Sequence, residues 1–177
     1  MDSAREIELM QQVRQGDEGA LREIIEHHRG YLYRLAYRLL GDGDDASDAV
    51  QETFIRLWRH ARRYDSRQSL RTWLGTICVR RCYDELRRRQ RHRRALTELP
   101  SGSLGAEPTT AEELLVELHR VVAELPAKQR VVYQLREIEC LTADEVARMT
   151  RMSSEQVKAN LYVARNTVRE KMKRYGV

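Results

Sequence analysis

Residues 142–174 read TADEVARMTRMSSEQVKANLYVARNTVREKMKR and contain two helix starts, about three helical turns apart. Thr142 is followed three residues later by Glu145, and Ser153 by Gln156, which is the spacing of a capping box. Apolar residues recur at helical spacing after each start. They are Val146, Ala147 and Met149 in the first segment and Val157, Leu161, Ala164 and Val168 in the second. The stretch therefore predicts a short helix, a tight turn and a longer helix.

Two helices that meet across a tight turn have the build of a protein that reads the major groove of DNA. The second predicted helix would expose Lys158, Tyr162 and Arg165 on the face opposite its apolar residues. This part of the chain therefore indicates a DNA-binding helix-turn-helix.

The composition favours an all-α protein. Of the 177 residues, 33% are charged and 6% are aromatic, with three prolines and nine glycines, so long stretches are free to be helical and a large aromatic core is not expected. Residues 97–111 hold two of the prolines and two of the glycines, which indicates a flexible linker. We therefore predict two small helical domains, 1–95 and 113–177, joined by a linker at 96–112.

The expected helices follow from caps and apolar stripes. In the first domain we expect helices from about Asp17 to Leu40, from near Asp44 and from near Ser69, with a loop at 62–68. In the second domain, Thr110 and Glu113 form another capping box, and Pro126 opens a helix that runs through Ile138.

Charge is distributed unevenly along the chain. The net charge is +5, but residues 62–94 alone hold twelve basic and three acidic residues, a local net charge of +9. Tyr64, Trp73 and Tyr83 lie among these arginines, and such a mixture suits single-stranded or opened DNA, since arginines neutralise phosphates and planar side chains stack on unpaired bases. For Trp73 a place in the core is the stronger alternative. The acidic helix start at 44–52 is also explained by the helix dipole alone.

The cysteines and the N-terminus indicate a cytoplasmic protein. No signal peptide or membrane-spanning run is recognisable, so Cys78, Cys82 and Cys140 are expected to be free thiols. Cys78 and Cys82 lie one helical turn apart, but no histidine or third cysteine is spaced to complete a tetrahedral metal site. We expect no metal, no cofactor and no enzymatic activity, and whether this pair has a redox role stays open.

Three segments resemble the bacterial RNA polymerase sigma factors, especially the extracytoplasmic-function (ECF) group. Residues 45–58, DASDAVQETFIRLW, are similar to the second conserved region, and residues 73–89, WLGTICVRRCYDELRRR, resemble the promoter-melting helix that follows it. Residues 125–139, LPAKQRVVYQLREIE, and the helix-turn-helix resemble region four. The resemblance spans nearly the whole chain in the right order.

The resemblance implies two kinds of site. Polymerase binding, to the clamp helices of the largest subunit, is implied for Asp45, Asp48, Gln51, Glu52 and Arg56. DNA binding is implied for Arg63, Tyr64, Arg67, Arg71, Trp73, Arg80, Arg81, Arg87 and Arg88 around the minus-ten element, and for Ser154, Lys158, Ala159, Asn160, Tyr162 and Arg165 at the minus-thirty-five element. Further implied partners are the flap of the second polymerase subunit and an anti-sigma factor. The protein is expected to be associated with the nucleoid and not inserted in the membrane, although an anti-sigma factor could hold it at the membrane.

Three positions depart from the family pattern. Arg80 stands where the family often has asparagine, Leu70 where it has phenylalanine, and Ala159-Asn160 where a serine-arginine pair is common. Because arginine pairs best with guanine and asparagine with adenine, the preferred promoter sequence is expected to differ from that of relatives.

Two other functions are compatible with the residues. A dimeric helix-turn-helix repressor would protect a palindromic operator without polymerase. An adaptor that grips polymerase without reading DNA would be indifferent to changes at Lys158 or Arg165.

Overall fold

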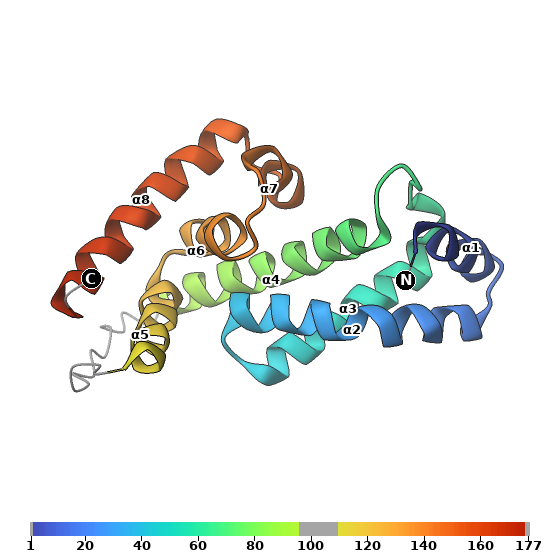
Figure 1. Ribbon diagram of the computed structural model, residues 1–177, viewed down its shortest axis with the longest axis horizontal. Coiled ribbons are helices and arrows are strands. Elements are labelled where there is room, and N and C mark those ends of the chain that lie inside the picture. Colours follow the sequence, from blue (N-terminus) through green and yellow to red (C-terminus); the bar gives the residue numbers. More distant parts are fainter. Residues whose placement is uncertain (1, 96–109, 176–177) are drawn as a thin grey trace. The chain divides into compact units, whose positions relative to one another are not determined.

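A computed structural model describes residues 2–95 and 110–175, and every regular element in these ranges is helical (Figure 1). The chain divides into two compact units, Met1–Cys82 and Tyr83–Val177. This division falls inside a long helix. The linker predicted at 96–112 lies, except for its last three residues, outside the described residues. The predicted all-α class with two helical domains is confirmed, while the domain boundaries stay a prediction.

The first unit contains α1 (Ser3–Arg14), α2 (Glu18–Leu40), α3 (Gly43–His60), the short 3-10 helix η1 (Ala61–Arg63) and the start of α4 (Leu70–Ala95). Aspartates cap the first three helices: Asp2, Asp17 and Asp42 each accept hydrogen bonds from backbone N–H groups of the following turn. Gly41 ends α2 in the left-handed conformation, with a φ of 72°. The helices expected near 17–40, 44 and 69 are therefore confirmed within two residues.

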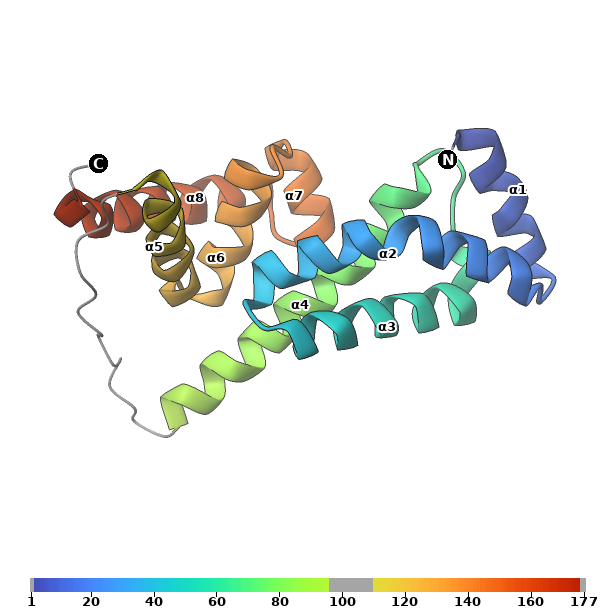
Figure 2. The same cartoon turned by 60° about the horizontal axis from the view of Figure 1, so that its bottom comes forward.

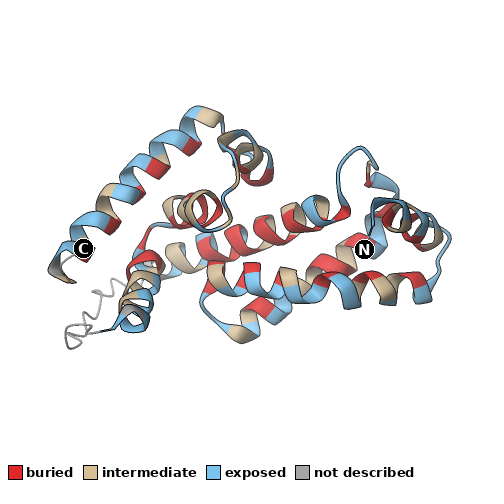
Figure 3. Cartoon of the chain, in the orientation of Figure 1, coloured by how far each residue is buried: buried red, intermediate tan, exposed pale blue. Residues whose placement is uncertain are grey.

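The core of the first unit forms where α2 and α3 lie side by side (Figures 1 and 2). Their inward faces are buried, and so is one face of α4, as the red bands in Figure 3 show. The largest fully buried side chains of α2, α3 and α4 are Ile24, Leu32, Leu39, Leu57, Leu70, Leu74 and Val79. This stripe-to-stripe packing follows from apolar residues recurring every three or four positions.

Helix α1 was not predicted from the sequence. It contributes Leu9, Met10 and Val13, all at most 3% exposed, and it packs against α2 and η1. The signal was present in Asp2 as a cap and in Leu9 and Val13 four residues apart, but the apolar stripe is short and the segment is rich in charge.

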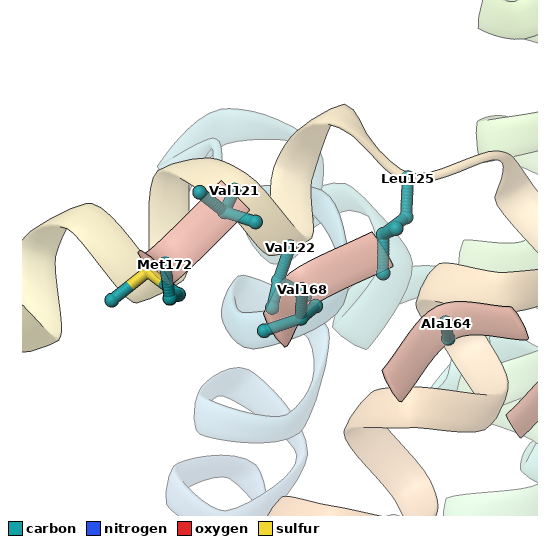
Figure 4. Close-up of a cluster of buried hydrophobic side chains, with 6 residues drawn as sticks. All are labelled: Val121, Val122, Leu125, Ala164, Val168 and Met172. Carbon is teal, nitrogen blue, oxygen red and sulfur yellow. The ribbon is translucent and has the colours of Figure 1, made fainter. Parts of the chain in front are cut away.

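The second unit contains the rest of α4, then α5 (Ala111–Glu124), α6 (Ala127–Tyr133), the π-helical turn η2 (Gln134–Ile138), α7 (Ala143–Thr150), α8 (Ser154–Met172) and η3 (Lys173–Tyr175). The predicted helix from Pro126 to Ile138 is confirmed in extent, but its last turn is wider than an α-helical turn. Figure 4 shows part of the core, where α5 meets α8. The buried residues there are Val121, Val122, Leu125, Ala164, Val168 and Met172.

All three predicted capping boxes form. The hydroxyls of Thr110, Thr142 and Ser153 accept from the N–H three residues on, and the side chain at that position accepts from the backbone N–H of the cap. Arg151 turns the chain between α7 and α8 with a φ of 61°. Helices α7 and α8 therefore form the predicted helix-turn-helix.

Candidate functional site

The acidic side chains of α3 share one face of that helix. Asp45, Asp48, Glu52 and Arg56 follow one another at intervals of three or four residues, while Ala46, Ala49, Thr53, Phe54 and Leu57 are buried on the other face. Asp48 and Gln51 are exposed, and the other three implied polymerase-binding residues are partly exposed. All five residues of this set, the α3 face, are thus accessible to a partner.

Two members of the α3 face already interact. The Arg56 Nε atom lies 2.8 Å from Glu52 Oε1, and this hydrogen bond lowers the pKa of the Glu52 carboxyl below its ordinary value. Asp48 carries its charge on an exposed side chain, so it is the member whose charge is most available to a cationic partner.

The loop between η1 and α4 is built around Tyr64. Its ring is 5% exposed and lies 5.5 Å from the Trp73 ring, centroid to centroid, and its hydroxyl donates to the Gln68 carbonyl. Burial raises the pKa of the Tyr64 phenol. Both aromatic residues implied for base stacking are therefore engaged with the loop itself, and Tyr64 shapes the loop from inside.

Two of the three carboxylates in the basic segment are paired with arginines. Arg67 forms a pair with Asp65, with Nη2 and Oδ2 2.6 Å apart, and Arg88 pairs with buried Glu85 at 2.7 Å. Hydrogen bonds from the Arg67 side chain and backbone N–H lower the pKa of Asp65 to about 2. The partners lie two and three residues apart in the sequence, so both pairs could be recognised from it.

The other arginines of the set have different surroundings. The Arg71 guanidinium lies 3.7 Å from the centre of the Tyr31 ring on α2, a cation–π contact that the sequence could not reveal because the partners are 40 positions apart. Arg63 and Arg87 are exposed, and Arg80 and Arg81 are partly exposed on α4. Arg63 and Arg71, at the two ends of the loop, are thus accessible, and Arg80, Arg81 and Arg87 lie further along α4.

Helix α8 presents the implied base-reading residues on its outer face. Lys158, Ala159 and Tyr162 are exposed, whereas Val157, Leu161 and Ala164 are buried. Tyr162 is 69% exposed, an unusual exposure for a large aromatic ring. This face could therefore meet a partner without any repacking of the core.

Three polar residues on this face are held by neighbours within the unit. The Ser154 hydroxyl donates to Asp144 on α7 at 2.6 Å, the Asn160 amide donates to the Gln156 carbonyl at 2.7 Å, and Arg165 Nη2 lies 2.7 Å from Glu137 Oε1. The Arg165 Nη2 group must leave Glu137 before it can contact a base, whereas Asn160 keeps a second N–H and its carbonyl oxygen available. Glu137, on η2, was missed by sequence reasoning because it lies 28 residues from Arg165.

The second unit also has an apolar groove between α5, α6, η2 and α8. It encloses about 430 Å³ and is lined by Leu114, Leu115, Leu118, Tyr133, Val168 and Met172, with Glu137, Arg165 and Arg169 at its polar positions. Leu115 is 55% exposed. An apolar side chain or helix from a partner would be desolvated there.

The cysteines offer no comparable site. Cys78 and Cys82 are free and buried in the core, and Cys140 is exposed. A hydrogen bond with Cys78, together with burial, raises the pKa of the Cys82 thiol. Among the described residues, no three histidine, cysteine or acidic side chains are placed to hold a metal ion. No described helix is long and apolar enough to span a bilayer.

Comparison with known proteins assigns a class to this arrangement. Residues 24–92 match the family model for Sigma-70 region 2, and residues 115–168 match that for Sigma-70, region 4. The two regions cover the loop and the helix-turn-helix and occur in the order of a sigma factor.

Curated relatives are similar over most of the chain. The ECF RNA polymerase sigma factor SigW of Bacillus subtilis strain 168 is 25% identical over 177 residues, covering 93% of this chain and 95% of SigW. The RNA polymerase sigma factor SigV of the same organism is 30% identical over 146 residues, covering 82% and 86%. The chain therefore belongs to the ECF RNA polymerase sigma factors. As such it directs RNA polymerase in promoter recognition and transcription initiation, and it is not an enzyme.

Solved structures share the fold. CnrH in complex with the cytosolic domain of CnrY has a TM-score of 0.65 and 21% identity, covering 97% of this chain and 98% of CnrH. RpoE from Bartonella quintana, in complex with the anti-sigma factor NepR, has a TM-score of 0.64 and 23% identity, covering 86% and 96%.

Proposed function

We propose that this sigma factor acts through three surfaces: the α3 face for polymerase, the loop and α4 arginines for the minus-ten element, and the outer face of α8 for the minus-thirty-five element. The observation that carries the proposal is the segregation of side chains on α3 and α8. On both helices the implied contact residues point outward, while the intervening apolar residues fill the core.

Polymerase docking rests on the charge of the α3 face. Its acids are preorganised on a rigid helix whose N-terminus is capped, and they suit a basic helical partner such as the clamp of the largest subunit. Asp48→Lys is expected to weaken holoenzyme formation at least tenfold, since one charge pair is lost and a like-charge contact is created. Glu26→Lys, which changes an equally exposed acid on α2, is the matched control. Equal affinities of the two variants for core polymerase would contradict docking through α3.

Promoter opening is assigned to the loop at 64–69 and to the accessible arginines beside it. Guanidinium groups such as Arg63 and Arg71 can hold the phosphates of a displaced strand, and an unpaired base can be captured by the loop. Since Tyr64 is buried, we assign it the role of shaping the loop and assign contact with DNA to the exposed arginines.

Reading of the upstream element is assigned to α8, inserted in the major groove. Lys158 is exposed, so it can contact DNA without breaking an existing pair, whereas Arg165 must leave Glu137. Phosphate contacts would fix the register, while Asn160 and Arg165 would supply base preference.

The apolar groove of the second unit is assigned to the flap of the second polymerase subunit. Its lining is mostly apolar, with a few charged side chains, as expected for a helix-binding groove. An anti-sigma factor that covered this groove and the α3 face would block polymerase at both places, and NepR illustrates that a protein of this fold can be held by such a partner.

Run-off transcription with purified core polymerase on genomic fragments tests the whole proposal. We expect transcription to begin at sites that require this protein, and we expect Lys158→Ala to weaken the preference for the upstream element at those sites. Protection of a palindromic site without polymerase would favour a repressor instead. Polymerase binding with unchanged start sites would favour an adaptor.

A further inference from the structure

Both ends of the proposed promoter-opening loop are attached to α1. At the start of the loop, Arg14 donates from Nε to the Ala61 carbonyl, at 3.2 Å, and from Nη2 to the Tyr64 carbonyl, at 2.7 Å. At its end, the Leu70 N–H donates to Glu6 Oε2 at 3.2 Å. Two side chains of one helix thus hold backbone groups on either side of residues 65–69.

The Glu6 contact lies at the first residue of α4. The first N–H groups of a helix have no partner within the helix, and Ser69 already satisfies that of Thr72. Glu6 satisfies that of Leu70, and its carboxylate also faces the positive end of a 26-residue helix dipole. Glu6 is 7% exposed and its Oε1 atom lies 3.6 Å from His28 Nε2, so the carboxylate is enclosed by the core of the unit.

The Arg14 contact acts on η1, the turn that leads into the loop. A guanidinium has donors in a rigid fork, so it can fix the separation of two carbonyl oxygens in a way that a lysine cannot. Both acceptors are backbone atoms, so the contact depends on the path of the chain and not on the side chains of the loop.

Helix α1 is itself firmly anchored. Leu9, Met10 and Val13 bury one face of it, and Arg5 joins its other end to α2 through Glu23, with Nε and Nη2 lying 3.0 Å and 2.7 Å from the two carboxylate oxygens. A helix fixed in this way can serve as a rigid reference for the loop. It also lies outside residues 24–92, which match the region 2 family model.

We propose that α1 is a brace that sets the shape of the promoter-opening loop, with Arg14 and Glu6 as positioning residues for DNA opening. The inference rests on the proposed function of the loop. Neither residue contacts DNA in this account; each limits the conformations of residues 64–70. A loop already in its working shape captures an unpaired base without first being ordered.

The first test examines the brace in the full-length chain without polymerase. In hydrogen exchange, Arg14→Ala should speed exchange of the amides at 64–70 by roughly tenfold, the effect of losing hydrogen bonds to a charged group, and leave α2 and α3 unchanged. Arg29→Ala, which removes an exposed arginine on α2 that takes no part in anchoring α1, is the matched control. Unchanged exchange at 64–70 in Arg14→Ala, or equal acceleration in both variants, would overturn the proposal.

The second test measures DNA opening by the holoenzyme. Arg14→Ala and Glu6→Ala should slow open-complex formation on duplex promoters by roughly tenfold, with core affinity unchanged, and a promoter carrying a pre-opened bubble should restore the rate. Glu6→Gln, which keeps an acceptor for the Leu70 N–H, should recover much of the loss, whereas Arg14→Lys should not. A defect that persists on the bubble, or Arg14→Ala opening as fast as the unaltered protein, would refute a positioning role.

Thermal unfolding of each variant is the control that would detect a general loss of structure. The exchange test does not require that the chain bind polymerase, so it decides whether the brace exists even if the proposed function fails. A failure of the unaltered protein to form open complexes would count against the proposed function, not against the brace.

Discussion

The pair between Arg165 and Glu137 makes a prediction that runs against the usual effect of breaking an ion pair. In the free protein, Arg165 Nη2 lies 2.7 Å from Glu137 Oε1, and the two side chains are 51% and 29% exposed. If Arg165 reads the upstream element, it must give up this carboxylate on binding DNA. Glu137→Gln removes that competitor and should strengthen promoter binding.

The expected magnitude follows from the exposure of the pair. Because Arg165 is half exposed, its bond with Glu137 is worth about 0.5 to 1 kcal/mol after screening by solvent. In Glu137→Gln this ion pair need not be broken when DNA binds, which corresponds to a two- to fivefold gain in affinity, since about 1.4 kcal/mol is a factor of ten. Removing a negative charge near the phosphates adds to the gain in the same direction.

The assay is the affinity of holoenzyme for a duplex bearing the upstream element, measured by fluorescence anisotropy over a range of salt concentrations. Glu170→Gln is the matched control, since Glu170 is also paired on α8, with Lys173 at 2.8 Å. A weaker or unchanged affinity for Glu137→Gln relative to that control would refute the reasoning and remove Arg165 from the reading face.

Three further predictions concern stability and are measured by urea unfolding of the full-length chain. Burial lowers the pKa of His28 from 6.5 to about 4, so as the pH falls the unfolded chain takes up a proton before the folded one does. The contribution of His28 to the free energy of unfolding should therefore be fully present above pH 6.5 and should fall by up to ~3 kcal/mol as the pH drops to 4. A pH profile unaltered by His28→Gln would contradict this. Ser153→Ala removes the cap of α8 and should cost about 1 kcal/mol, with Ser47→Ala as a control outside any cap. Leu74→Ala creates a cavity at a fully buried position and should cost roughly 2–5 kcal/mol; a loss below 1 kcal/mol would mean that α4 is packed more loosely than its burial indicates.

Local patterns in the sequence were sufficient for most of the secondary structure. The three capping boxes, Gly41 as the end of α2 and the apolar stripes of α2, α3 and α8 each depend on interactions within a few residues, so they could be recognised without coordinates. Helix α1 was not predicted because it is stabilised mainly by tertiary contacts. Leu9 and Met10 are buried by other helices, and a short charged helix shows little apolar periodicity of its own.

The sequence by itself therefore determined the helical class and the order of the two sigma regions, and it predicted which residues face polymerase and DNA. The tertiary structure decided which of those residues are available, because availability depends on neighbours distant along the chain. Arg165 meets Glu137 28 residues away, and Leu70 meets Glu6 64 residues away. Tyr64, whose aromatic ring suits stacking on bases, is buried, because Gln68 and Trp73 pack against it. Helix caps and stripes arise from the covalent spacing of residues, whereas these contacts exist once burial and packing have brought separate helices together.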